Sequence, residues 1–561
     1  MSATGPLFTQ AHQVAHLALH PACMLVCHVF ITSLSLRSSD TLFRIIKRTE
    51  NRANMRVTNR LITPLVLFFV CTSFFIFRNI EGLGGLPFSD ESGHFLGVLA
   101  MQHGDRLYRD YIDAHGPLVF MLSWILGPIA GASHLWVFRF VSTLMASLAG
   151  LGIFYTSLFT FNWQRYLAIA MWLGSIASVW TVQGLNLDSY WPIGGALTVI
   201  SLATFVMPMC LNKPVSMPQA FCGGFATALL PFAAYAFGPL AVFFYAIPCL
   251  IWLFHRATYR GTIKEITLGC FCACSVMTLW LALYGDIGGM IAFHIIANQK
   301  WYAHYIPFGI DAFLHGMALS FAPDHIIETL AVIAFGFGSF LLVWKSTFKL
   351  SALLAICGLM TLQIRGMNSF QNGAFLMAAF ALASLMATAC LKNFLNILAL
   401  LAFGSVGGVF LFSQHALSSP WGQTLAQRRA AEWHLTQDDT VDFARTIRTY
   451  TQPNERILAV PYSPDVYLLA HRLPIKKYHA YLPWEADYAA HPWHGYDRDL
   501  CVDLPKDKPP AIYFDSWVIW GVHDPKKFMS CVVDILHTDY TQMPAGSSVY
   551  IRNDRLPRSP S

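Results

Sequence analysis

Long apolar runs constrain this chain more than any other feature of its sequence. Stretches of about 17 to 25 mostly apolar residues recur between Leu61 and Ser413, roughly the length that an α-helix needs to cross a bilayer. Of the 561 residues, 55% are hydrophobic and 12% are charged, a composition that excludes an ordinary soluble globular protein. An all-α polytopic membrane bundle is expected, because a helix satisfies its own backbone hydrogen bonds in lipid.

Basic residues predict the orientation of this bundle. Lys and Arg gather in short connections such as Arg44 to Arg60 and His255 to Lys264, and connections of this kind stay in the cytoplasm. Counting spans from the first basic segment gives about eleven transmembrane helices. The net charge of +6 is then a signal of topology, and no nucleic-acid partner is expected.

The count divides the chain into three parts. Residues 1–60 are expected to be a cytoplasmic, partly disordered segment in which translation starts at Met55 rather than Met1. Residues 61–413 form the membrane domain, and 414–561 form an extracytoplasmic tail. The outer connections are expected at 79–135, 183–191, 285–321 and 365–372. The apolar piece Gly116 to Ala130 is assigned to a re-entrant or interfacial helix, because a full span there would move the later basic loop outside.

The tail differs from the rest of the chain in composition. It carries more charge and more Pro, with short apolar runs at Arg456 to Val460 and Ala511 to Phe514 that indicate strands. A small α/β domain is therefore predicted. Cys501 and Cys531 both lie in it; they could pair in an oxidising compartment, and two free thiols fit the sequence equally well.

Carboxylates directly after the first span are the main chemical signal. Asp90 and Glu91 are adjacent there, where a charge close to lipid is costly unless it is solvated or used. A carboxylate in this place can act as a general base toward an acceptor hydroxyl. The alternative is a solvated loop in which Ser-Asp-Glu begins a helix.

The stretch that follows carries a family resemblance. The run from Asp90 to Leu118 resembles the first outer loop of GT-C glycosyltransferases, the polyprenyl-phosphate-sugar-dependent group that includes protein mannosyltransferases and the aminoarabinose transferase. The matching motifs are Asp90-Glu91, Gly104, Tyr108-Arg109-Asp110-Tyr111 and Gly116-Pro117-Leu118. Three tail segments look like the C-terminal part of bacterial members: Asp442 to Tyr450, Pro453 to Val460 and Tyr467 to Pro474.

The resemblance implies roles for three acidic residues. Asp90 becomes the leading catalytic carboxylate, with Glu91 beside it. Asp188, in the second outer loop, would orient the acceptor or hold a cation; an Asx turn before Trp191-Pro192 explains it equally well. A divalent cation is possible, since metal use in the family varies, but these carboxylates do not define a metal site. No other cofactor is implied.

A phosphate-linked donor also needs cations on the outer side. Arg109, Lys300 and Arg365 are the candidates, and Arg365 is preferred because a guanidinium matches phosphate oxygens. A snorkelling Arg at a helix end is the alternative for Arg365. Tyr302 lies in an aromatic and cationic run around Lys300 that would suit a sugar, although an interfacial aromatic belt explains the same run.

Together these features imply an integral membrane glycosyltransferase, a hexosyl or pentosyl transferase of the GT-C type. It would move a sugar from a polyprenyl-phosphate donor to a glycan, lipid or protein acceptor on the extracytoplasmic face of the inner (plasma) membrane, in cell-envelope polysaccharide or lipopolysaccharide assembly. A polysaccharide polymerase or ligase is the nearest alternative, although Arg-rich middle loops would be expected of it. A transporter would carry ionisable residues within its spans. A scaffold without activity also fits.

Overall fold

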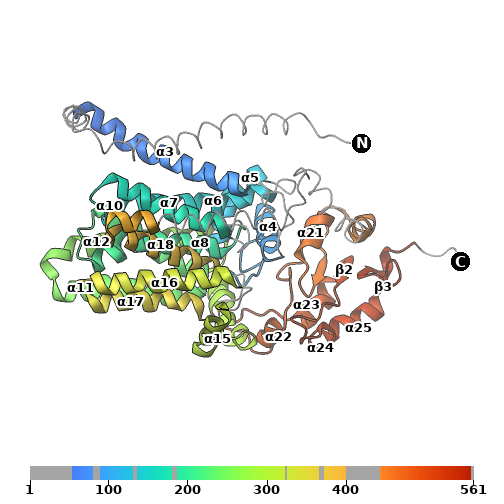
Figure 1. Cartoon of the computed structure of the whole chain (residues 1–561). Coiled ribbons are helices and arrows are strands. Elements are labelled where there is room, and N and C mark those ends of the chain that lie inside the picture. Colours follow the sequence, from blue (N-terminus) through green and yellow to red (C-terminus); the bar gives the residue numbers. More distant parts are fainter. Residues whose placement is uncertain are drawn as a thin grey trace.

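A bundle of long helices and a smaller α/β domain lie end to end in the computed structural model (Figure 1). The bundle is built from the middle of the chain, and the tail forms the second domain at one end of it. The structure describes residues 53–79, 89–130, 135–179, 185, 187–321, 325–364, 372–399 and 442–557.

The bundle helices follow the apolar runs of the sequence. They are α3 (Ala53–Asn79), α6 (Phe140–Tyr155), α7 (Asn162–Val179), α8 (Tyr190–Ser201) with its continuation to Cys210, α10 (Met217–Ala233), α11 (Gly238–Phe254), α12 (Arg256–Tyr284), α16 (Ile326–Lys345), α17 (Lys349–Met360) and α18 (Gly373–Cys390). Six helices of the described chain are long and apolar enough to cross a membrane, and Thr63–Ile76, Pro117–Ile129 and Lys349–Gln363 are shorter apolar helices. The prediction of a polytopic helical membrane protein is confirmed. Residues 393–399, at the start of the last expected span, are helical. The rest of that span lies outside the described residues.

Small residues let the central helices approach closely. The stretch Tyr190–Cys210 is 94% buried and α18 is 89% buried, whereas α12 is only 33% buried. A Cβ on Gly195 would lie 3.0 Å from the Cα of Ala374, so α8 and α18 pack backbone to backbone. Close packing through small residues is the usual way in which membrane helices associate. The peripheral helices keep their apolar side chains exposed toward the region that lipid occupies.

Two connections differ from the sequence-based expectation. The basic segment expected as a loop at 255–264 forms the first turns of α12, which begins at Arg256. The outer connection 285–321 is largely helical, with α13 (Ile287–Gly289), η5 (Met290–Tyr302), α14 (Ala303–Tyr305) and α15 (Ile310–Ser320). Both segments are therefore helical where the sequence-based assignment expected a connection.

The tail contains the predicted strands and a four-stranded sheet. The strands are β1 (Leu458–Val460), β2 (Ala511–Phe514), β3 (Tyr540–Gln542) and β4 (Val549–Arg552), in the order β1-β2-β4-β3. β1 and β2 are parallel, and the other pairs are antiparallel. The tail helices are α21 (Pro464–Ala470), α22 (Pro483–Ala490), α23 (Leu500–Asp507), α24 (Pro525–Phe528) and α25 (Ser530–Asp539). A disulfide joins Cys501 of α23 to Cys531 of α25, with Cα atoms 5.6 Å apart.

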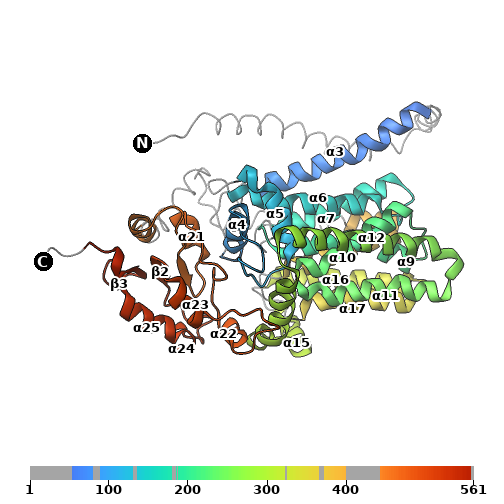
Figure 2. The same ribbon diagram turned by 180° about the vertical axis from the view of Figure 1, so that it is seen from behind.

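The tail lies against one end of the bundle (Figure 2), and polar contacts join the two parts. Arg456 of the tail forms a bidentate ion pair with Asp105. Its Nη1 and Nη2 donate to Oδ2 and Oδ1, both at 2.8 Å. Lys476 lies 3.1 Å from Asp110, and the Tyr496 hydroxyl donates to Asp286 at 2.9 Å. The acidic residues expected on one side of the membrane therefore share that side with the tail.

Candidate active site

Helix α4 carries the acidic pair at the border between bundle and tail. It spans Ser89–Gln102, and Asp90 and Glu91 lie in its first turn, where the positive end of the helix dipole favours carboxylates. Successive residues on a helix point in different directions. The two carboxylates consequently enter two separate environments, one inside the bundle and one facing the tail.

Glu91 is fully buried and paired inside the bundle. Its Oε1 accepts from Arg139 Nε at 2.7 Å, and its Oε2 accepts from Arg139 Nη2 at 2.6 Å. Oε1 also accepts from the backbone N–H of Asp188 at 3.0 Å. Both oxygens are thus engaged by Arg139, the residue just before α6, and Oε1 is also engaged by the turn before α8. The catalytic role of Glu91 stays a prediction, and this geometry is that of a positioning residue.

Asp188 lies next to this pair, and its role in orienting the acceptor or holding a cation stays a prediction. Its Oδ2 accepts from Ser123 Oγ of α5 (Pro117–Ala130) at 2.7 Å. Its Oδ1 is buried without a hydrogen-bond partner in the described structure. Burial raises the pKa of Asp188 well above its usual value, and the Glu91 charge adds to this effect. The buried Oδ1 marks Asp188 as a group able to take a further donor.

Asp90 faces the tail instead. The Tyr462 hydroxyl, just after β1, donates to Asp90 Oδ1 at 3.1 Å. Burial raises the pKa of Asp90, while the nearby His115 and the bond from Tyr462 act in the opposite direction. A carboxylate with a raised pKa is a stronger base than an exposed Asp. Gly93 lies close to the same hydroxyl, since a Cβ at this position would be 3.4 Å from the Tyr462 oxygen.

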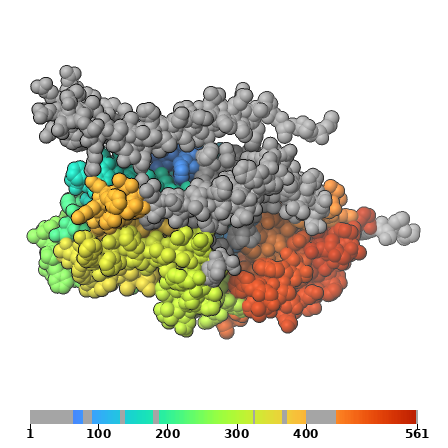
Figure 3. Space-filling model, viewed as in Figure 1, coloured from blue at the N-terminus to red at the C-terminus, as the bar shows by residue number. Residues whose placement is uncertain are grey.

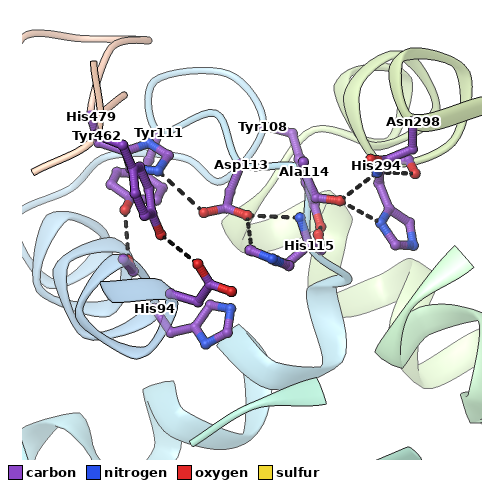
Figure 4. A network of polar contacts seen from close by, with 12 residues as sticks. His94, Tyr108, Tyr111, Asp113, Ala114, His115, His294, Asn298, Tyr462 and His479 are labelled. Carbon is purple, nitrogen blue, oxygen red and sulfur yellow. Dashed lines mark hydrogen bonds and ion pairs between the residues drawn. The ribbon is translucent and has the colours of Figure 1, made fainter. Parts of the chain in front are cut away.

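Asp113 forms the centre of a histidine cluster (Figure 4). It lies near Asp90, since its charge contributes to raising the pKa of Asp90. His115 Nδ1 lies 2.7 Å from Asp113 Oδ1, and His479 Nε2 of the tail lies 3.3 Å from Oδ2. Burial alone would raise the pKa of Asp113, but these two histidines outweigh it and hold the pKa well below its usual value. Tyr111 stacks on His479 with ring centroids 4.5 Å apart. Asp113 therefore stays ionised within the site.

His94 adds an unpaired nitrogen to the same cluster. Its Nδ1 lies 2.8 Å from the Asp188 carbonyl oxygen, which can only accept, so Nδ1 carries the proton. Its Nε2 is buried without a partner in the described structure. Burial, with His115 nearby, lowers the pKa of His94 to about 4. The ring is therefore neutral at pH 7, with a lone pair on Nε2.

The wall behind the cluster is formed by the loop before α5 and by η5. The Tyr108 hydroxyl donates to the His115 carbonyl at 2.6 Å, and Tyr108 holds a positive φ of 65°. Asn298 and His294 of η5 both reach the Ala114 carbonyl, at 2.7 and 3.1 Å. A strained backbone kept in place by surrounding contacts is common at functional sites.

The predicted donor-binding residues are not gathered around Asp90. Arg109 and Lys300 are exposed, and Lys300 lies over the ring of Trp301 at 5.9 Å. Tyr302 packs against Trp484 of the tail, with ring centroids 4.7 Å apart. Arg365 lies outside the described residues. The donor-binding roles of these four residues remain predictions.

Several residues of the site escaped the sequence-based reasoning. In the sequence, Arg139 resembles an ordinary basic residue at a helix end, and His94 and His115 resemble ordinary loop histidines. Tyr462 and His479 gave no signal, since they lie more than 350 positions from Asp90 in the chain. Within the described residues, no group of three or more His, Cys, Asp or Glu side chains is arranged to hold a metal ion.

Comparison with known proteins bears on the fold. No protein-family model matches the chain, and no curated protein sequence matches it. Among solved structures, ArnT from Cupriavidus metallidurans in the apo state matches with a TM-score of 0.50 at 10% identity, over 89% of this chain and 98% of ArnT. The archaeal oligosaccharyltransferase AglB from Archaeoglobus fulgidus, in complex with an inhibitory peptide and a dolichol-phosphate, scores 0.47 at 13% identity, over 89% and 75% of the two chains. The match to apo ArnT covers nearly all of both chains, so the two proteins share their overall fold.

Proposed function

We propose that the protein is a membrane glycosyltransferase that uses a polyprenyl-phosphate sugar, with Asp90 as the general base. The observation that carries this proposal is the half-buried Asp90 beside Asp113, His115 and Tyr462, at the junction of the bundle and the tail. A lipid-linked donor would approach from the bilayer and a polar acceptor from the aqueous side. Their reacting groups would meet at this junction.

The chemical step follows from these positions. The Asp90 carboxylate takes the proton of an acceptor hydroxyl, and the oxygen forms a bond to the anomeric carbon of the donor. The bond from that carbon to the phosphate oxygen breaks at the same time, and polyprenyl phosphate leaves with the electron pair. Attack in line with the leaving group inverts the anomeric configuration.

Neighbouring residues have supporting roles in this proposal. Tyr462 holds Asp90 through Oδ1, and within the described residues Oδ2 has no hydrogen-bond partner, so it can accept the proton. Asp113 keeps His115 and His479 in place next to Asp90. The unprotonated Nε2 of His94 and the unpaired Oδ1 of Asp188 are acceptors for hydroxyls of the sugar or the acceptor. Arg109, Lys300, Tyr302 and Arg365 are proposed to contact the donor phosphate or sugar.

The proposed location is the extracytoplasmic face of the inner membrane. Arg256, Arg260 and Lys264 lie at the start of α12, whereas its other end leads to Asp286 and the tail. By the positive-inside rule, the basic end is cytoplasmic and the tail is outside. The Cys501–Cys531 disulfide supports the same side, because such bonds persist in oxidising compartments. Alkaline phosphatase fused after the tail should be active, and an inactive fusion would contradict this orientation.

Cell-envelope glycan composition tests the proposed activity. A deletion strain should lack one sugar or carry a truncated glycan, detected by mass spectrometry, and the wild-type chain should restore it. Asp90→Asn should fail to restore it at an equal protein level. Asp311→Asn is the matched control, because Asp311 is an exposed carboxylate of α15 on the same side. Full complementation by Asp90→Asn would exclude the proposed base.

A further inference from the structure

A loop of the tail exposes an unusual density of apolar side chains. Between residues 517 and 522, Trp517 is 44% exposed, Trp520 47% and Val522 74%, and Val518 is also exposed. A contiguous apolar surface of this kind on a soluble domain marks an interaction site. These six residues contain two indole rings and two valines. A partner must therefore offer an apolar environment to the valines and also accommodate the amphipathic indole rings.

The exposure is built into an ordered turn. Ile519 is buried and anchors the loop, and its backbone exchanges two hydrogen bonds of 3.0 Å with His523. Gly521 occupies a positive φ of 73°, which permits the tight reversal. The backbone N–H of Trp517 donates to Asp515 Oδ1 at 3.0 Å. The turn therefore holds its apolar side chains outward while Ile519 points in.

Aromatic contacts place the loop at the border with the bundle. Trp520 stacks on Trp484 of α22 with ring centroids 5.4 Å apart, and Trp484 lies 5.7 Å from the Tyr305 ring of α14. His523 also contacts Tyr305, at 5.1 Å. Figures 1 and 2 both place α22 next to α15 at this end of the bundle.

Helix α15 continues the apolar surface of the loop. Ile310 and Leu314 of this helix are exposed, as is Phe308 just before it. Figure 3 shows the yellow-green residues of this region and the red residues of the tail side by side along the lower edge of the molecule. Exposed apolar side chains therefore lie on both sides of this border, on α15 and on the loop of the tail.

The chemistry of the loop matches a bilayer surface. Trp is amphipathic and favours the boundary between headgroups and acyl chains. Removing valine side chains from water is favourable, but these side chains cannot form hydrogen bonds with the hydroxyls of a sugar. Lys526 and Lys527 follow in α24, both exposed, where they can contact lipid phosphates. A glycan platform would surround its rings with polar side chains instead of Val518 and Val522.

We infer that the loop from Trp517 to Val522 is a membrane anchor. It inserts its indole rings and valines into the phospholipid leaflet on the tail's side, beside α15, and the two lysines contact headgroups. The tail is then held by the bilayer as well as by its polar contacts with the bundle. This inference does not depend on the proposed transferase activity.

A photoreactive residue in the full chain tests the anchor. Val522 is replaced by p-benzoylphenylalanine, and the protein is reconstituted into vesicles of phosphatidylethanolamine and phosphatidylglycerol. Illumination should give phospholipid adducts at position 522, found by mass spectrometry. The matched control is the same replacement at Val502, an exposed valine of α23 in the same domain.

The yields at the two positions decide the outcome. Position 522 should give at least about tenfold more lipid adduct than position 502, because acyl chains reach only interfacial residues. Equal yields at the two positions, or no lipid adduct at 522, would overturn the anchor. In whole cells, adducts at 522 only to a glycan or to another protein would overturn it as well. A circular dichroism spectrum like that of wild type confirms folding of both variants.

Discussion

Asp90 and Glu91 are adjacent in sequence, yet they belong to different regions of the molecule. Glu91 points into the bundle, where Arg139 and the Asp188 backbone N–H engage both of its oxygens. Asp90 points toward the tail, where Tyr462 is the partner that contacts it. In the bundle the negative charge is balanced by a guanidinium. At the tail the charge is only partly compensated, and the pKa is raised.

This difference indicates that the Glu91 carboxylate serves the structure, whereas the Asp90 carboxylate is suited to chemistry. A buried charge with a complete set of partners stabilises its surroundings only while the partner is present. A buried charge with incomplete compensation has an altered proton affinity, which is a common property of catalytic groups. The pair therefore predicts opposite responses to neutralisation at two consecutive positions.

The largest effect is expected from Asp90→Asn. Loss of a general base should lower the transfer rate by about a thousandfold, without loss of stability. Burial raises the folded-state pKa of Asp90, so its ionised form destabilises the folded protein above a pH of about 4, and a neutral amide removes that cost. The rate is measured as release of polyprenyl phosphate, and the melting temperature at pH 7 should be equal to or above that of wild type. Unfolding of the Asp90→Asn variant would show that Asp90, like Glu91, is needed for stability, and would contradict its separate chemical role.

Glu91→Gln should instead act on stability. It removes the carboxylate that lies 2.6 Å from the buried Arg139 guanidinium, and breaking a buried ion pair from one side costs about 3 to 5 kcal/mol. The melting temperature in nanodiscs should fall strongly. The double variant Glu91→Leu/Arg139→Leu should recover most of the loss, since it removes both charges. A single variant as stable as wild type would mean that the pair is dispensable.

Tyr462→Phe should have a smaller effect, visible in the pH profile. Transfer needs the Asp90 carboxylate, so the rate falls as the pH drops through its pKa. The Tyr462 bond lowers that pKa, and its removal should shift the acidic limb of the profile to higher pH, with a roughly tenfold lower rate at neutral pH. Tyr496→Phe is the control, because it removes a similar bond to Asp286 outside the site. Equal shifts in both variants would exclude a specific role for Tyr462.

The smallest effect is expected from Lys300→Ala. Lys300 is exposed, so its attraction to a donor phosphate is screened and worth about 0.2 to 1 kcal/mol. The KM for the lipid donor should rise up to about fivefold, kcat should not change, and the effect should shrink in high salt. Lys506→Ala, an exposed lysine of α23, should leave the KM unchanged. A salt-independent loss of kcat would assign Lys300 another role.

Much of the architecture could be predicted from local pattern. The apolar runs located α6, α8, α16 and α18, because a helix in lipid needs only length and composition. The runs around Leu458 and Ile512 located two strands. The helical start of α12 and the helices of the connection 285–321 were not predicted, because charge and topology say where a span ends but not whether the residues beyond it stay helical.

Only the acidic residues of the site could be predicted from the sequence. Asp90, Glu91 and Asp188 stand out because carboxylates are rare in so apolar a chain. His94, Asp113 and His115 lie within the same loop region, but nothing in their spacing distinguishes them from ordinary loop residues. Tyr462 and His479 enter the site only because the tail docks on the first loop through pairs such as Arg456 with Asp105.

The sequence by itself determined that this is a polytopic membrane protein with an α/β tail and carboxylates at one end of its bundle. Hydropathy and charge act locally along the chain, so these properties can be read from it directly. Only the tertiary structure decided that Glu91 is neutralised by Arg139 while Asp90 faces Tyr462. The state of a carboxylate depends on the groups within a few ångströms of it, and here those groups come from elements far apart in the chain.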